Sequence, residues 1–444
     1  MYSLISHLNS RQQTRFANIA RTLNTWAALI PGGLIESQVR GQPYVGFNAL
    51  VLNQTERDEL AQLTYIFGQV WLKALTAIVS DSTSDLSLLG WPTALDFPLR
   101  SEPPNRWLTA LGRFDFALDP DNHWQLLEFN SDTPSGAQEA SLIEARSLPL
   151  LTRFCRNYQL ARLNPSIGTA MAQALLDEAN FAPVPFEIES VSAESPTRQP
   201  VIGFLARGRH LTDLAQVLYY TQALRDLNPT LNCVVGDPLN LALVNNRPLL
   251  LGQPLDALYR LFPIEDFWRD PIFAAYTQAN LNGSFKCLNN LRGFLAQSKA
   301  ILAWIWRERE NASLFDATER AVIAAHLPPT YFIKDFESEP GQGYIIKEFF
   351  GREGVGVWDG ANLDATQWQS FQQNGNYIVQ SKVNITPLPH FWLNARNQLQ
   401  SGLVTPCVGS FLIGGEWGGC YSRVGKPITD ALAQFVPTLL DTPH

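Results

Sequence analysis

The chain has 444 residues, 45% of them hydrophobic and only 17% charged, which is enough apolar material for a large core divided into roughly two or three lobes. Its net charge of −8 and the lack of any long run of Lys or Arg argue against nucleic-acid binding. Five scattered cysteines without a C-x-x-C pair argue against a disulfide framework or a zinc site. This cysteine usage fits a reducing cytosol, so we expect a cytoplasmic protein.

The sequence also lacks the signals of several other classes. No apolar run reaches the roughly 18 residues of a membrane span, so no membrane is expected as a partner. The first residues lack the apolar centre of a signal peptide. Neither H-E-x-x-H nor G-x-S-x-G occurs, so chemistry through a histidine-activated nucleophile is not expected.

Residues 1–90 are predicted to form an N-terminal helical region. Within them, residues 55–79 show the apolar periodicity of an amphipathic helix. Thr55 followed by Asp58 resembles a capping box at the start of this helix.

The next predicted region, residues 91–200, contains two segments that we expect to be adjacent strands. They are GRFDF at 112–116 and LLEFN at 126–130, joined by the turn-rich DPDNHW. Residues two apart in a strand share a face, so a hairpin would bring four polar side chains to one place. Asp115, Glu128 and Asn130 offer hard oxygen donors that suit Mg²⁺ bridging substrate phosphates, and Arg113 could hold a phosphate or a carboxylate. An ordinary half-exposed strand, which alternates in the same way, is the alternative.

The run SDTPSG follows Asn130 and leads into a helix predicted over residues 137–159. Thr133, Ser135 and the backbone amides around Gly136 therefore lie near a helix N-terminus, a position that binds anions. An ordinary helix cap is the other interpretation, and both can hold together.

Residues 201–285 are predicted to form an α/β lobe, after a proline-rich loop or boundary at 183–200. The pattern predicts a β-α-β unit, then an apolar strand, then several helices. The expected elements are strands at 201–206 and 231–236 around a helix near 211–226, strand character over 249–263, and a helix near 265–280. Further helices are expected near 298–308 and 316–326, at the start of the next region.

The last region, residues 286–444, carries a glycine-rich turn between two predicted strands, in YIIKEFFGREGVGVW at 344–358. Lys347 ends the first strand, and Gly351, Gly354 and Gly356 shape a turn whose backbone amides could fold over phosphates. Lys347 could reach the same phosphates as a point charge. The segment is not a Walker sequence, because G-K-[ST] is absent. A glycine hairpin without a ligand is the alternative.

Two other segments place polar groups at the ends of apolar elements. In NYIVQSKV at 376–383, the strand ends in Gln380, Ser381 and Lys382, an edge that could offer amide hydrogen bonds to a planar base. Lys299 begins an apolar helix or strand in QSKAILAWIW. Taken alone, each is also compatible with an ordinary strand end or a solvated helix cap.

Taken together, these segments resemble the glutathionylspermidine synthase family. The matching pieces are GRFDF, LLEFNSDTPSGAQEAS, YRLFP, QSKAILAWIW, YIIKEFFGREGVGVW, YIVQSKV, VGSFLIGG and SRVGKPITD. The resemblance implies an α/β (α+β) fold of the ATP-grasp type with its segments in permuted order, because the carboxylates precede the lysines. It also implies a pre-ATP-grasp lobe at 201–285 and an ATP-binding lobe at 286–444, with the metal and substrate part at 91–200.

The resemblance implies a role for each matching residue. Asp115, Glu128 and Asn130 match Mg²⁺ ligands. Arg113 and Arg423 match catalytic arginines near the transferred phosphoryl group and the reaction centre. The positions that match ATP-binding and substrate-binding residues are Lys299, Lys347, Gly351, Arg352, Glu353, Gly354, Gln380 and Lys382 for ATP, and Thr133 and Ser135 for the peptide substrate.

The chain also departs from the family pattern. The stretch before residue 90 is too short for the cysteine amidase domain of bifunctional members, so amidase activity is not expected. Glu348 replaces the usual proline after Lys347. Residues 206–214, ARGRHLTDL, are basic apart from Asp213 where an acidic polyamine site is sought, so spermidine is expected to be a poor substrate. If spermidine is used, Glu265 and Asp266 are the other candidate carboxylates for the amine.

The sequence therefore predicts an ATP- and Mg²⁺-dependent carboxylate–amine ligase that acts through an acyl phosphate and joins a small peptide or acid to an amine. A kinase-like phosphotransferase would use the same metal ligands and lysines. A non-catalytic nucleotide-binding protein is a second rival, although no metal ligand or phosphate lysine is lost. An α/β scaffold without a ligand is a third. The expected partners are small molecules, and the sequence names neither the acid, the amine nor the oligomeric state.

Overall fold

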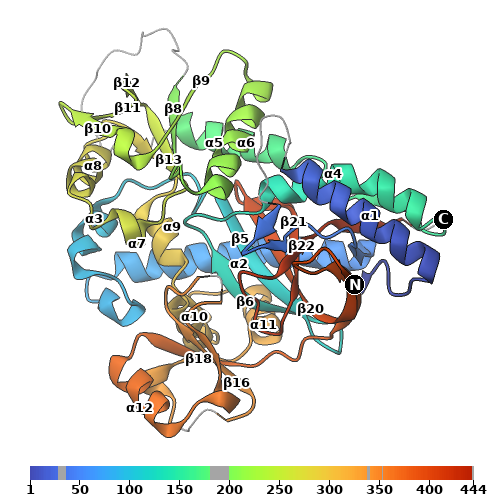
Figure 1. Cartoon of the computed structure of the whole chain (residues 1–444). Helices are drawn as coiled ribbons and strands as arrows, with labels where there is room; N and C mark the ends of the chain where they lie inside the picture. Colours follow the sequence, from blue (N-terminus) through green and yellow to red (C-terminus); the bar gives the residue numbers. More distant parts are fainter. Residues whose placement is uncertain (29–36, 181–199, 338–340, 353, 443–444) are drawn as a thin grey trace.

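The computed structural model describes residues 1–28, 37–180, 200–337, 341–352 and 354–442. An antiparallel sheet runs through the middle of the molecule, between an α/β lobe and a lobe built on a smaller sheet (Figure 1). The loop predicted at 183–200 lies outside the described residues apart from Pro200. The helix that precedes it along the chain is described as far as Asn180.

The central sheet is six-stranded and holds the two strands that the sequence singled out. Its order is β22-β21-β20-β5-β6, with β19 also paired to β20, and all these pairings are antiparallel. The bounds are β5 Leu111–Leu118, β6 Trp124–Asn130, β19 Leu388–Leu393, β20 Leu399–Ile413, β21 Glu416–Gly425 and β22 Gln434–Val436.

The two faces of β5 and β6 carry different chemistry because side chains alternate along a strand. Phe114 and Phe116 face helix α2 (Gln54–Ser80), where both rings pack against Phe67. Phe114 also stacks on Phe129 of β6, with the ring centroids 3.9 Å apart. This alternation turns the charged residues between the phenylalanines toward the opposite face.

Helix α2 confirms the amphipathic helix predicted at 55–79, but its cap differs. The capping box is formed by Asn53 and Glu56, not by Thr55 and Asp58, because the helix begins at Gln54. Among the described helices, α2 is the one that is long and apolar enough to cross a membrane, yet 61% of its most apolar window is buried inside the protein. The expectation that no membrane is a partner therefore stays a prediction.

The other face of the central sheet packs against helices α1 (Ser10–Ala27), α4 (Ala137–Phe154) and α5 (Ile167–Asn180). Helix α4 ends five residues before the predicted residue 159, since the chain turns at Cys155 to form a short strand from Leu160.

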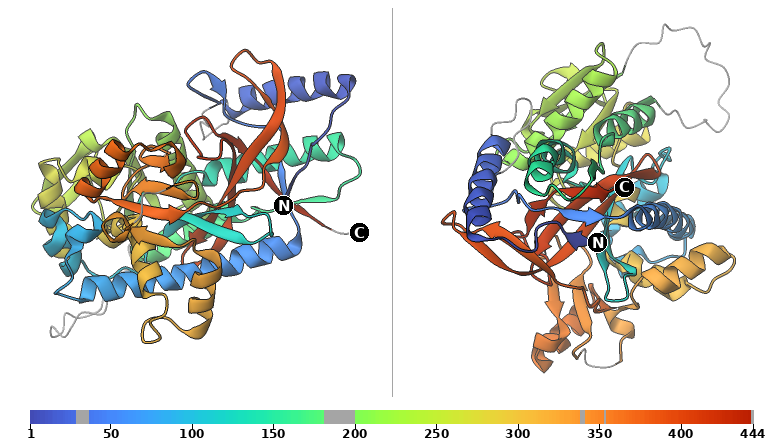
Figure 2. Two further views of the ribbon diagram at one scale, coloured as in Figure 1. Left: turned by 90° about the horizontal axis from the view of Figure 1, so that it is seen from below. Right: turned by 90° about the vertical axis from the view of Figure 1, so that its right-hand side faces the viewer.

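A further sheet joins the two ends of the described chain. Tyr2 donates to the Asp441 carboxylate at 3.0 Å, and Figure 2 shows the termini close together. The strands of this sheet are β1 Tyr2–Ser3, β4 Leu50–Leu52, β23 Thr438–Asp441 and β7 Leu160–Arg162. A separate hairpin is formed by β2 Gln38–Val39 and β3 Gln42–Pro43.

The α/β lobe confirms the predicted β-α-β unit. Strand β8 (Val201–Leu205), helix α6 (Leu211–Leu227) and the parallel strand β9 (Asn232–Gly236) follow each other. The sheet order is β14-β13-β8-β9. The remaining bounds are β10 Leu241–Val244, β11 Arg247–Leu250, β12 Gln253–Pro254, β13 Ala257–Arg260, β14 Lys286–Cys287, α3 Asp96–Ser101, α7 Ile264–Phe267, α8 Ile272–Leu281 and α9 Leu291–Ala296.

Two predicted elements of this lobe are broken in the structure. The strand expected over 249–263 becomes three strands, because Leu251 and Gly252 both adopt positive φ and turn the chain. The helix expected over 265–280 is split by Pro271, which cannot continue a helix from the preceding turn.

The third lobe is an antiparallel sheet in the order β15-β18-β16-β17, with α12 over it (Figure 1). The predicted strand–turn–strand at 344–358 is confirmed as β16 and β17. The bounds are α10 Ala300–Glu308, α11 Ala317–His326, β15 Thr330–Phe332, β16 Tyr344–Glu348, β17 Val357–Asp359, α12 Ala365–Asn374 and β18 Tyr377–Ser381.

Candidate functional site

The predicted hairpin brings its four polar residues together as expected. Arg113 lies opposite Asn130 and Asp115 lies opposite Glu128 across the β5–β6 pair. Since directly opposed residues project from the same side of a sheet, the four side chains form one patch. A bulge leaves Leu127 without a partner, and its carbonyl accepts a hydrogen bond from outside the sheet.

Arg113 and Asp115 form a two-pronged ion pair in the floor of this patch. Arg113 Nε and Nη2 donate to the two Asp115 carboxylate oxygens at 2.6 and 3.0 Å, and Nη1 donates to the Ser135 carbonyl at 2.7 Å. Gly409 of β20 lies opposite Asp115, and a Cβ there would come within 2.5 Å of Arg113 Cδ. The close pair therefore depends on glycine at position 409.

The two predicted phosphate lysines approach the patch from other elements. Lys299, at the start of α10, holds its Nζ 3.2 Å from Glu128 Oε2 and donates to the Gly351 carbonyl at 2.7 Å. Lys347 of β16 donates to the Leu127 carbonyl at 2.9 Å and to Gln380 Oε1 at 2.6 Å. The structure thus brings together two lysines, a carboxylate and Gln380, which was predicted to lie at the edge that binds a planar base.

The electrostatics of this network reflect its burial. Burial lowers the pKa of Lys347 to about 8, partly opposed by the Glu128 carboxylate. Burial alone would raise the pKa of Glu128, but Lys299 and Lys347 outweigh it and lower that pKa to about 2. The Glu128 carboxylate therefore stays charged at neutral pH. The Lys347 ammonium loses its proton near pH 8, well below the ordinary pKa of 10.5.

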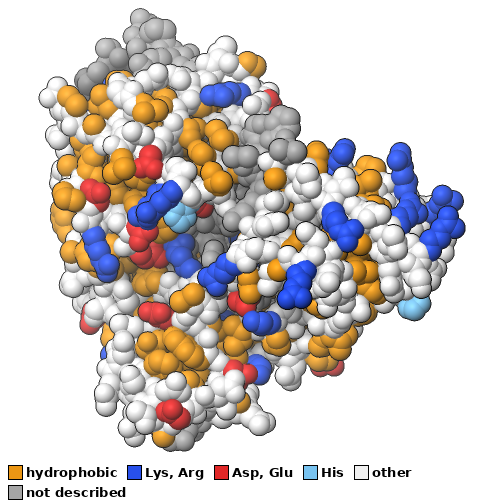
Figure 3. Space-filling model, viewed as in Figure 1, with side chains coloured by type: hydrophobic (Ala, Val, Ile, Leu, Met, Phe, Trp, Pro, Cys, Tyr) orange, Lys and Arg blue, Asp and Glu red, His pale blue; other side chains and the backbone are white. Residues whose placement is uncertain are grey.

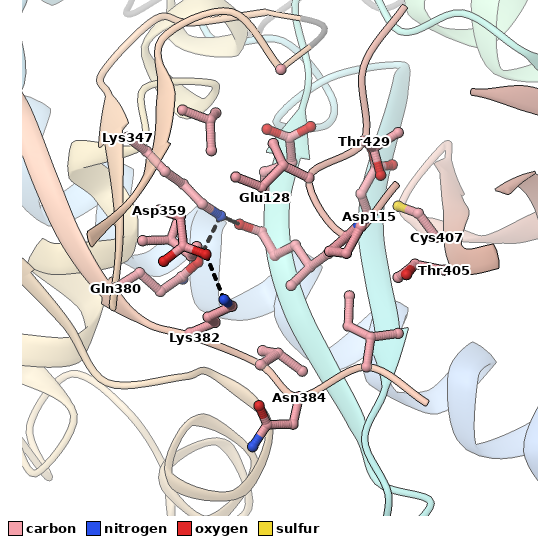
Figure 4. Close-up of a pocket in the computed structure, with 18 of the residues that line it drawn as sticks. Asp115, Glu128, Lys347, Asp359, Gln380, Lys382, Asn384, Thr405, Cys407 and Thr429 are labelled. Atoms are coloured by element: carbon pink, nitrogen blue, oxygen red, sulfur yellow. Dashed lines mark hydrogen bonds and ion pairs between the residues drawn. The ribbon is translucent and has the colours of Figure 1, made fainter. Parts of the chain in front are cut away.

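Glu128, Lys347 and Gln380 of this network line a cavity of about 340 Å³ between the central sheet and the β15–β18 lobe (Figure 4). Glu128 and Asp115 lie on one wall and Lys347 and Gln380 on the other. Two further charged residues of the lining pair with each other, since the Lys382 ammonium lies 2.6 Å from the Asp359 carboxylate. The apolar part of the lining is formed by Leu127, Ile345, Val357, Val383, Ile385, Pro387, Pro427 and Ile428.

Arg423 of β21 lines this cavity and also a second one of about 640 Å³. Its Nη2 lies 3.8 Å from Asp115 Oδ2, and its guanidinium lies 5.8 Å from the centre of the Tyr421 ring. Ser135 lines the second cavity, whereas the Thr133 hydroxyl accepts a hydrogen bond from Arg352 at 2.9 Å. Charged groups of both signs gather in this middle part of the molecule (Figure 3).

The described part of the glycine loop comprises residues 349–352 and 354–356, between β16 and β17. Gly354 lines the first cavity, and a Cβ there would come within 2.4 Å of the Thr429 carbonyl. Arg352 extends to Glu265 in the α/β lobe, with Nη2 and Glu265 Oε1 2.8 Å apart. Glu353, also expected at the nucleotide, lies outside the described residues.

The residues predicted to hold a magnesium ion offer two carboxylates and one amide. The side-chain NH₂ of Asn130 donates to Asp115 Oδ2 at 3.4 Å and to Glu128 Oε1 at 3.5 Å, so its oxygen faces away from them. A rotation of this amide would present three oxygens to one point, which fits a hard cation. Among the described residues, no group of three or more His, Cys, Asp and Glu side chains gathers as a metal cluster.

Sequence reasoning missed a buried ion pair beside this site. Asp132 and Arg260 are both fully buried and paired with each other. The Asn289 amide links them by donating to the Asp132 carbonyl at 2.8 Å and to the Arg260 carbonyl at 2.7 Å. The available signal was an arginine inside the apolar run LYRLFP, a position where a charge needs a partner. Asp359, the partner of Lys382, was also missed.

The comparisons with known proteins agree with this architecture. Residues 245–441 match the family model described as glutathionylspermidine synthase preATP-grasp. This part of the chain is therefore similar to the glutathionylspermidine synthase family. The match crosses the boundary predicted at residue 285, so the predicted limits of the lobes remain predictions. No curated protein matches the chain.

A solved structure has a similar fold. A glutathione synthetase-like effector from Globodera pallida, in its apo form, is similar with a TM-score of 0.64 over 98% of both chains, at 10% sequence identity. At this identity the likeness concerns the fold. The predicted ATP-grasp-like α/β fold is thereby confirmed.

Proposed function

We propose that the chain is an ATP- and Mg²⁺-dependent ligase that joins a carboxylate to an amine. The observation that carries this proposal is that Asp115, Glu128 and Lys347, from β5, β6 and β16, line one cavity, while Lys299 of α10 pairs with Glu128 beside it. Four charged groups from distant parts of the chain are costly to bury together, so their convergence favours a charged ligand.

The chemistry follows from the substrates. A carboxylate is a poor electrophile, and transfer of the γ-phosphoryl group of ATP converts it into an acyl phosphate. The amine then attacks the carbonyl carbon and loses a proton, while phosphate leaves with the electron pair of the C–O bond. Phosphoryl transfer depends mainly on positioning and charge neutralisation, which fixed cations in a closed cavity supply.

We assign the binding of the phosphates, the base, the metal and the transferred phosphoryl group to different residues of the two cavities. Lys299 and Lys347 offer ammonium groups to the phosphates, and the apolar part of the lining of the first cavity offers a surface for a planar base. Mg²⁺, when held by Asp115, Glu128 and a turned Asn130, would neutralise phosphate charge. Arg423 lines both cavities, so its guanidinium is placed to bind the phosphoryl group as it passes to the acid.

The second cavity is the proposed place of the acid and the amine. Its lining holds Arg209 and Arg423 against Glu139 and Asp213, with His210 beside them. A polyamine entering such a balanced cavity would lose hydration without an excess of carboxylates to pair with. We therefore propose an amine that carries few positive charges, or a carboxylate of its own.

Thermal unfolding with ATP and Mg²⁺ tests the nucleotide part of the proposal. Binding to the folded state should raise the melting temperature, and Lys347→Ala should reduce that rise. Lys334→Ala is the matched control, because Lys334 belongs to the same lobe but does not line this cavity. A rise equal to that of the unaltered chain in Lys347→Ala would remove Lys347 from the site.

A further inference from the structure

Arg352 ties the glycine loop to the α/β lobe. Its Nε and Nη2 donate to Glu265 Oε1 at 3.0 and 2.8 Å, Nη2 also reaches Oε2 at 3.0 Å, and Nη1 donates to the Thr133 hydroxyl at 2.9 Å. Such a forked contact to a carboxylate is stronger and more directional than a single ion pair. Both side chains are about one-third exposed, at 33% for Arg352 and 29% for Glu265, so solvent only partly weakens the contact.

The anchor on the α/β lobe is held rigidly. Glu265 lies in α7, whose first amide, that of Ile264, donates to Asp132 Oδ2 at 3.3 Å. Asp132 is fully buried against Arg260, and its Oδ2 lies 3.6 Å from Arg352 Nη2. The loop arginine therefore docks on a fixed group of charges and not on a freely moving side chain.

Two other contacts of the loop lie at the first cavity or beside it. The Gly351 carbonyl accepts from Lys299 Nζ at 2.7 Å, and Gly354 packs against the carbonyl of Thr429 while lining that cavity. Arg352 lies between these two glycines in the chain. A contact that holds Arg352 therefore holds the loop over the charged end of the cavity.

We propose that Glu265 is a positioning residue that acts through Arg352 to keep the glycine loop closed over the first cavity. This inference rests on the proposed ligase function for its chemical consequence. With the loop closed, the amine is the nucleophile that reaches the acyl phosphate. With the contact broken, water attacks the same carbonyl carbon, phosphate leaves, and the acid is regenerated, so that ATP is consumed without amide formation.

Hydrogen exchange tests the contact without any substrate. In the nucleotide-free chain, amides in the peptide 344–352 should exchange at least about tenfold faster in Glu265→Gln and in Arg352→Gln than in the unaltered chain. Asp266→Asn is the matched control, because Asp266 is the next residue of α7 but pairs with Arg207 at 3.4 Å. Its exchange should equal that of the unaltered chain. Unchanged exchange in both Glu265→Gln and Arg352→Gln, or equal acceleration in Asp266→Asn, would overturn the proposal.

A second measurement separates this inference from the proposed function. The ratio of ADP released to amide formed should rise in Glu265→Gln, although ATP and Mg²⁺ still raise its melting temperature. A ratio equal to that of the unaltered chain would refute the role of Glu265 and leave the ligase proposal standing. If the unaltered chain forms no amide, the ligase proposal fails, while the exchange experiment still decides whether Glu265 holds the loop.

Discussion

Replacing Lys347 by methionine should stabilise the ligand-free chain at neutral pH while reducing the rise in its melting temperature with ATP. Lys347 is buried, and burial lowers its pKa from the ordinary 10.5 to about 8. Since a tenfold change in an acid constant equals about 1.4 kcal/mol, holding this ammonium charged in the folded state costs about 3 kcal/mol below pH 8.

The substitution also removes two hydrogen bonds. The Leu127 carbonyl and Gln380 Oε1 would lose their donor, at a cost of about 1 kcal/mol each. Glu128 keeps Lys299 as its partner. Lys347→Met should therefore raise the free energy of unfolding by about 1 kcal/mol at neutral pH, whereas most substitutions of buried residues lower it.

The difference should reverse in alkaline solution. Between pH 8 and pH 10.5 the unfolded chain still holds the Lys347 proton and the folded chain does not, so the stability of the unaltered chain rises with pH in this window. By about pH 10 the unaltered chain should be the more stable by about 1 kcal/mol. Urea unfolding followed by tryptophan fluorescence at both pH values measures the two differences. A difference that does not change with pH, or a variant less stable at neutral pH, would refute this reasoning.

Three other predictions concern the site. Asp115→Asn and Glu128→Gln should each lower Mg²⁺-dependent ATP turnover by about two orders of magnitude or more while circular dichroism stays unchanged, because each removes a charged metal ligand; near-normal turnover in Glu128→Gln would remove it from the metal site. Gly409→Ala should also lower turnover, because the new Cβ would lie 2.5 Å from Arg113 Cδ and displace that side chain; a structure of the variant with Arg113 unmoved would contradict this. Spermidine should be a poor substrate in a product assay by mass spectrometry, and efficient glutathionylspermidine formation at micromolar spermidine would be the contrary result.

The sequence predicted the site best where local rules decide the geometry. Alternation along GRFDF and LLEFN placed Arg113, Asp115, Glu128 and Asn130 on one face, and the hairpin pairing follows from the short turn between the strands. Lys347 at the end of an apolar strand was recognisable for the same reason. The roles given to these residues remain predictions.

The contacts between distant segments were beyond local rules. Glu265 and Arg352 are 87 residues apart, and no local pattern pairs an acid in one lobe with a loop arginine in another. The bulge at Leu127 was equally hidden, although it turns the carbonyl that Lys347 binds. The start of α2 was misplaced by one residue, because Asn and Thr both serve as helix caps and the sequence offered each with an acidic residue three positions later.

One measurement tests the central claim most directly. The chain is incubated with ATP, Mg²⁺ and pairs drawn from a panel of small peptides, acids and amines, while ADP release and product mass are followed. The account predicts that ADP release depends on an acid and an amine together, that the product mass equals both substrates minus one water, and that Glu128→Gln abolishes it. A product heavier than one substrate by a phosphoryl group would instead identify a kinase and contradict the ligase account.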